Sequence, residues 1–118
     1  MQPVPKVSRA DVERVVRREF PASQHADATA ILDAYDRDGS GAGRARIQLA
    51  VLKLSRGSLV ELRRNVREAE LDFRDVLAAA EYPAASRNTS FIGDPVTPGQ
   101  QQIFEEDWEQ YRRWLERP

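Results

Sequence analysis

The chain has 118 residues, with 18 basic and 19 acidic side chains and no cysteine. This composition excludes disulfides, thiolate metal sites and cysteine nucleophiles, and the near-neutral charge gives no general attraction to nucleic acid or membranes. No apolar run approaches the ~20 residues of a membrane span, and the N-terminus lacks the apolar core of a signal peptide. We therefore expect a single cytoplasmic domain over residues 1–118, with 1–7 flexible. The many alanines and the strong preference for arginine over lysine indicate a GC-rich bacterial genome.

Apolar residues at helical spacing predict two helices in the first third of the chain. Ser8 and Asp11 form a helix-start signal, and valines then recur until a proline ends the run, which predicts a helix over about 9–20. A second helix begins near Ser23 and ends at the glycine-containing segment 36–43.

The middle of the chain predicts two longer helices joined by a short connection. The third helix follows the glycine segment and ends at Gly57, and the fourth begins with a capping box formed by Ser58 and Glu61 and ends near Glu81. The fourth helix carries a seam of seven apolar residues at alternating spacings of three and four: Leu59, Leu62, Val66, Ala69, Phe73, Val76 and Ala80. The short connection favours an antiparallel hairpin of these two helices at the centre of an all-α, five-helix bundle.

An irregular loop is predicted over 83–97, followed by a fifth helix that begins near Thr97. This helix has an aromatic stripe that includes Trp108, and the stripe is interpreted first as a face that docks on the bundle. The same helix is a candidate contact for another chain, with Arg113 and Trp114 as its exposed residues, because Trp and Arg dominate binding hot spots.

Residues 36–41 read as the first half of an EF-hand calcium loop. Asp36, Asp38 and Ser40 occupy ligand positions and Gly41 the glycine position, but Ile47 stands where a bidentate glutamate is needed. We interpret the segment as a turn and predict no metal or cofactor, and a degenerate calcium-binding protein remains an alternative.

No catalytic constellation is visible, so we expect no enzyme activity. His25 is the only histidine, no serine lies in a nucleophile elbow, and the glycine segment lacks the ending of a phosphate loop. Charge is segregated, with eight basic and two acidic residues in 37–67 and two basic and ten acidic residues in 68–109. Oppositely charged helices lying side by side explain this pattern, and a nucleic-acid module that uses the 44–67 stretch is the disfavoured alternative.

The strings at 43–55, 72–77 and 81–83 resemble a group of uncharacterised small, all-helical bacterial proteins. The resemblance spans roughly 27–118 and implies no activity, cofactor or partner. It singles out four residues near the end of the fourth helix, which form either a capping and salt-bridge cluster or a binding surface: Arg74, Asp75, Glu81 and Tyr82.

The prediction for function is a helical protein-interaction domain that binds an unknown protein partner or a second copy of itself through the fourth or fifth helix. A small-molecule or enzymatic role at the four-residue cluster ranks behind both this prediction and the nucleic-acid alternative.

Overall fold

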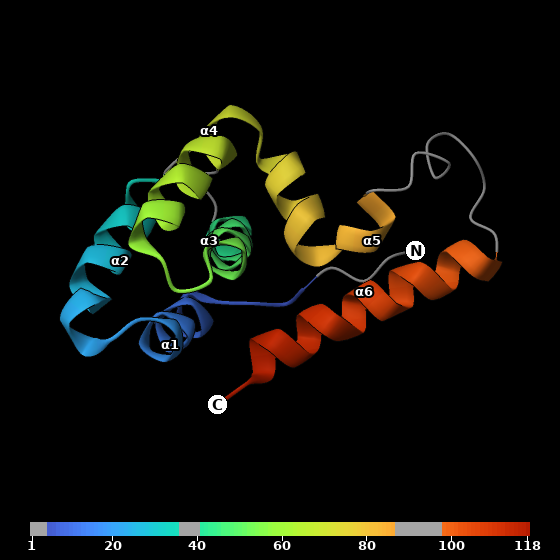
Figure 1. The fold of residues 1–118 in the computed structure, drawn as a ribbon, viewed down its shortest axis with the longest axis horizontal. Coiled ribbons are helices and arrows are strands. Elements are labelled where there is room, and N and C mark those ends of the chain that lie inside the picture. The colour runs from blue at the N-terminus through green and yellow to red at the C-terminus, as the bar shows by residue number, and fades with distance from the viewer. Residues whose placement is uncertain (1–4, 36–40, 87–97) are drawn as a thin grey trace.

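The computed structural model describes residues 5–35, 41–86 and 98–118, and its described residues form helices and no strands (Figure 1). The elements are α1 (Arg9–Glu19), a 3-10 helix (Ala22–Gln24), α2 (His25–Asp33), α3 (Gly41–Ser55), α4 (Leu59–Glu81), α5 (Pro83–Ser86) and α6 (Pro98–Glu116). The predicted all-α class, the five main helices and the central hairpin are confirmed. No described helix combines the length and the apolar character that crossing a membrane requires.

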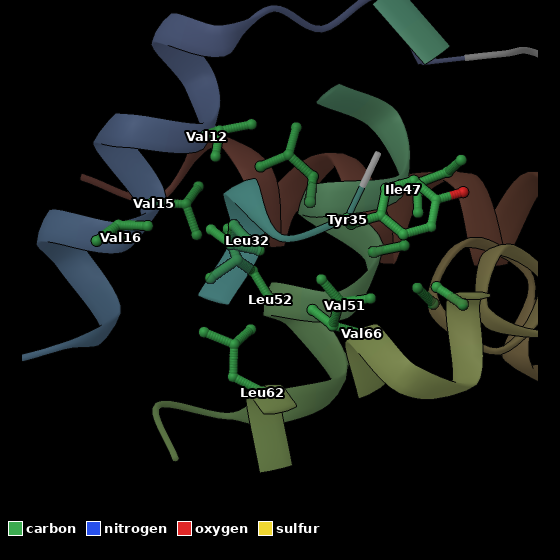
Figure 2. Close-up of a cluster of buried hydrophobic side chains, with 14 of the residues drawn as sticks. Val12, Val15, Val16, Leu32, Tyr35, Ile47, Val51, Leu52, Leu62 and Val66 are labelled. Carbon is green, nitrogen blue, oxygen red and sulfur yellow. The ribbon is translucent and has the colours of Figure 1, made fainter. Parts of the chain in front are cut away.

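Helix α3 is the centre of the core. Figure 1 shows it end-on, enclosed by α1, α2 and α4, and its most extensive contact is with α4. Its residues Leu49, Ala50 and Leu52 are completely buried. Figure 2 shows this cluster, in which α3 meets side chains of three neighbouring helices: Val12, Val15, Val16, Leu32, Leu62 and Val66.

The hairpin between α3 and α4 depends on a left-handed turn. Arg56 has φ of 51° and Gly57 has φ of 79°, a conformation that glycine adopts without steric cost. A Cβ at Gly57 would lie 2.8 Å from the carbonyl oxygen of Glu19. Ser58 then caps α4, because its Oγ accepts the Glu61 backbone N–H at 3.2 Å.

Helix α6 packs against its own chain at its C-terminal end. Tyr111 is fully buried, and two arginines of α1 bond to the last carbonyl groups of α6. Arg14 Nη2 donates to the Leu115 carbonyl at 2.7 Å, and Arg18 Nη1 donates to the Arg117 carbonyl at 2.9 Å. These bonds satisfy carbonyls that a helix end leaves without a partner.

The structure describes parts of the two segments that were predicted to be irregular (83–97) or flexible (1–7). Pro83–Ser86 forms α5, and the buried Asp107 caps this helix by accepting the backbone N–H groups of Ala84 and Ala85. The remainder of the predicted loop, 87–97, lies outside the described residues. At the N-terminus, Pro5 is buried and Val7 packs on the core, so the segment predicted to be flexible is anchored there.

The predicted apolar seam of α4 is wrong at one position. Phe73 is 43% exposed, whereas Leu62, Val66 and Val76 are buried. The reason is a break at Asp72, whose φ of −156° and ψ of 98° are not helical. Phe73 directly follows this break and is turned toward solvent, whereas Val76 and Ala80 further along α4 are again buried.

Candidate functional site

The candidate site is a groove of about 720 Å³ between the start of α3 and the middle of α4, which we call the α4 groove. Tyr35 and Ile47, both buried, form an apolar part of its lining. Leu71, Phe73 and Arg74 line it beside the break in α4.

Asp72 creates this shape by beginning a new helix within α4. Its backbone is extended, and its Oδ1 accepts the backbone N–H of Arg74 at 3.0 Å, which is the geometry of an N-cap. Arg74 also donates its Nε to the same oxygen at 3.1 Å. These hydrogen bonds from Arg74 favour the charged form of the Asp72 carboxyl and lower its pKa.

The break leaves two large apolar side chains in solvent next to the groove. Leu71 is 78% exposed and Phe73 is 43% exposed. The other large apolar residue exposed in the described part of the chain is Val60, at 70%, which lies near the start of α4 and does not line the groove. Two of the three large apolar side chains exposed in the described residues therefore lie beside the α4 groove.

A buried ion pair connects the groove to the interior. Glu81 accepts two hydrogen bonds from Arg46, from Nε at 2.8 Å and from Nη2 at 2.7 Å. The Glu81 side chain is 1% exposed and that of Arg46 is 27% exposed, since Arg46 also lines the groove. The hydrogen bonds from Arg46 to Glu81 raise the pKa of Arg46 against the opposing effect of burial.

Tyr111 of α6 lies close enough to this pair to respond to its charge. Its hydroxyl is buried and has no hydrogen-bond partner among the described residues. Burial, with a smaller contribution from the charge of Glu81, raises the pKa of Tyr111 well above its usual range. The hydroxyl is therefore protonated at neutral pH.

The four residues predicted near the end of the fourth helix do not form one cluster. Arg74 pairs with Asp72, and Glu81 pairs with Arg46. Asp75 is exposed. Tyr82 makes an edge-to-face contact with Phe104, with ring centroids 5.6 Å apart. Three residues of the candidate site were not among the predicted site residues: Arg46, Leu71 and Asp72.

The prediction that Trp114 is exposed is wrong. Trp114 is 6% exposed, its Nε1 donates to Glu19 at 3.4 Å, and the guanidinium of Arg18 lies 5.1 Å from the ring centroid. Trp108 is partly buried and packs on the core. Arg113 is exposed, as predicted, and pairs with Glu109 at 3.4 Å. The aromatic stripe thus docks α6 on its own bundle.

The candidate calcium ligands Asp36, Asp38 and Ser40 lie outside the described residues. The second half of that pattern begins α3, and Ile47, at the position of the missing glutamate, is 4% exposed in the core. Across residues 5–35, 41–86 and 98–118, no three potential metal-ligating side chains come together. His25 places its Nε2 2.8 Å from the Phe20 carbonyl oxygen.

Several arginines of the 44–67 stretch are engaged within the molecule. Arg44 Nη2 donates to the Asp33 carbonyl at 3.0 Å, Arg46 pairs with Glu81, and Arg64 lies 3.5 Å from Glu61. A basic surface for nucleic acid would therefore have to be formed by the remaining members of the stretch.

Comparisons with protein-family models, with curated proteins and with solved structures give no match for this chain.

Proposed function

We propose that the protein is a helical interaction domain that associates with a second copy of itself through the α4 groove. The observation that carries the proposal is the exposure of Leu71 and Phe73 directly beside a groove of about 720 Å³. Large apolar side chains next to a concave surface are typical of the centre of a protein interface. The cysteine-free composition fits a reducing compartment, and we propose the bacterial cytoplasm as its setting.

A second copy is the occupant that this surface fits. A two-fold interface brings the same patch of both chains together, so the patch must contain both a projection and a recess. Leu71 and Phe73 provide the projection and the groove provides the recess. The lining also has charges of both signs, Arg46 and Arg74 with Glu70 and Asp72, so that two copies can present opposite charges to each other.

The break in α4 determines which apolar side chains the proposed interface can use. Helix α4 changes direction along its length (Figure 1). Leu71 directly precedes the break at Asp72 and Phe73 directly follows it, and both side chains are exposed. A continuous helix would place Phe73 on the same face as Val66 and Val76, inside the bundle. Exposure of Phe73 is thus coupled to the break at Asp72.

The test compares three charge-introducing variants on the same helix. Leu71→Glu and Phe73→Glu place a carboxylate in the proposed contact, and Val60→Glu makes the same change at an exposed apolar residue away from the groove. Sedimentation velocity over a concentration series should show a dimer for the wild type and for Val60→Glu, and monomers for the other two variants. A dimer that survives both groove variants would place the interface elsewhere.

A further inference from the structure

A second recess, of about 570 Å³, lies where the C-terminal parts of α1, α3 and α6 meet. Four basic side chains and one acidic side chain line it, and we call it the basic recess: Lys53, Arg56, Arg113, Arg117 and Glu19. It shares no lining residue with the α4 groove, so any ligand of the basic recess is independent of the proposed self-association.

The single carboxylate of the recess already has two partners, Arg18, which does not line the recess, and Trp114, which does. Glu19 Oε2 lies 3.5 Å from Arg18 Nε, and Glu19 Oε1 accepts the indole N–H of Trp114 at 3.4 Å. Arg18 does not line the recess. Among the described residues, none of the four cations that line the recess forms an ion pair with Glu19.

Helix capping does not account for these cations either. Basic residues near helix C-termini are favoured by the helix dipole, but Arg14 and Arg18 already hold the last carbonyls of α6. At the end of α3, the backbone N–H of Ser58 bonds to the Ser55 carbonyl at 3.0 Å.

Arg113 pairs with Glu109 at 3.4 Å on the surface of α6 and remains exposed. The side chains of Lys53, Arg56 and Arg117 form no ion pair among the described residues, so these three cations are available to a ligand.

Lys53 is the most informative of the four. It is partly buried, and its ammonium has no hydrogen bond or ion pair among the residues that the structure describes. Burial lowers the pKa of Lys53, and the neighbouring charges of Arg56 and Arg117 lower it further against the attraction of Asp107. Positive charges held together in a partly buried place repel one another until an anion binds between them.

We propose that the basic recess is a binding site for a small phosphate-bearing anion. Lys53 of α3 contacts the phosphate, together with Arg113 of α6 and Arg117, which directly follows α6. Arginine binds phosphate oxygens through two parallel N–H groups and lysine acts as a point charge. The volume lies within the roughly 300–1,000 Å³ usual for small-ligand sites.

The chemistry that the recess recognises is the phosphate charge. The indole of Trp114 is 6% exposed and already has Arg18 over its ring, so it offers no free face for stacking of a nucleobase. A phosphate ester and free pyrophosphate both carry negatively charged phosphate. They differ in that the ester has an organic group, which would occupy the rest of the recess.

Calorimetric titration with pyrophosphate, and separately with glycerol 3-phosphate, at fixed ionic strength tests the proposal. Arg113→Gln changes an exposed side chain and should weaken binding of the tighter probe roughly tenfold. Arg63→Gln, which removes another exposed arginine that does not line the recess, should change it by less than about twofold. Tighter binding of glycerol 3-phosphate would identify an ester as the ligand, and tighter binding of pyrophosphate a bare anion.

Lysine provides a second readout because the chain has only Lys6 and Lys53. With 13Cε-labelled lysine, pyrophosphate should shift the Lys53 signal and raise its apparent pKa, while the Lys6 signal stays in place. The proposal is overturned if neither probe binds, if both arginine variants lose affinity equally, or if the two lysine signals shift alike. Far-UV circular dichroism of each variant confirms that it is folded.

Discussion

Removing the charge of Glu81 should destabilise the fold strongly. Glu81→Gln keeps the size of the side chain but leaves an amide, whose oxygen accepts from one donor of Arg46 while its NH2 group faces the other donor. Breaking a fully buried ion pair costs about 3–5 kcal/mol. Because the Arg46 side chain is 27% exposed at the groove and retains some hydration, we expect a loss of about 2–3 kcal/mol in the free energy of unfolding.

Urea unfolding followed by far-UV circular dichroism measures this loss. The double variant Arg46→Met/Glu81→Leu replaces both charges with apolar groups, and it should lie within about 1 kcal/mol of the wild type, since no unpaired charge remains. Arg112→Gln, which disrupts an exposed pair, should leave the urea midpoint unchanged. A loss below about 1 kcal/mol for Glu81→Gln would refute the reasoning, because it would show that the pair is hydrated.

The buried hydroxyl, the hairpin turn and the helix break each give a further prediction. Tyr111→Phe removes a buried hydroxyl with no hydrogen-bond partner among the described residues, and should raise the unfolding free energy by about 1 kcal/mol in urea. Because the pKa of Tyr111 is raised in the folded state, the unfolded chain loses its proton first and stability falls above about pH 10; the Phe variant should show a shallower fall. Gly57→Ala should cost about 2 kcal/mol or more, from the positive φ and the approach to the Glu19 carbonyl, and an unchanged urea midpoint would contradict the turn geometry. The 13Cα shift of Asp72 should be extended in character between helical neighbours, and Asp72→Ala should make it helical; a helical shift in the wild type would contradict the break.

The positions of the main helices could be predicted because capping and terminating residues close to the helix ends mark where each helix begins and ends. Ser8 and Asp11 bond to each other as the start signal requires, with the Ser8 N–H 3.0 Å from Asp11 Oδ2. Ser58 caps α4 as predicted, and Gly57 has the left-handed conformation that ends a helix. Such signals depend on residues a few positions apart, so they do not need knowledge of the tertiary fold.

The groove could not be predicted because Asp72 was interpreted as part of a continuous helix. The apolar seam on both sides of it has regular helical spacing, and this pattern concealed a capping residue in the middle of the helix. The local signal was present, since Asp75 stands three residues after Asp72, an acidic residue at the position used in a capping box. The regular spacing of the seam predicts that Phe73 lies on the apolar face of the helix, whereas it is 43% exposed.

The other differences between the prediction and the structure arise from contacts between residues that are far apart in the sequence. Trp114 is buried because Arg18 and Glu19 of α1 contact it. Arg46 reaches Glu81 across the hairpin. The pairing of these residues depends on how the helices pack, and nothing in the spacing of a single helix specifies it. The resemblance to uncharacterised bacterial proteins remains a prediction, as does the incomplete calcium loop.

Sedimentation velocity of Leu71→Glu beside Val60→Glu tests the central claim most directly. The two substitutions are chemically similar, lie on the same helix and replace side chains that are 78% and 70% exposed. The proposed self-association predicts that Leu71→Glu sediments as a monomer at concentrations where the wild type and Val60→Glu sediment as dimers. A wild type that stays monomeric throughout, or two variants that behave alike, would contradict it.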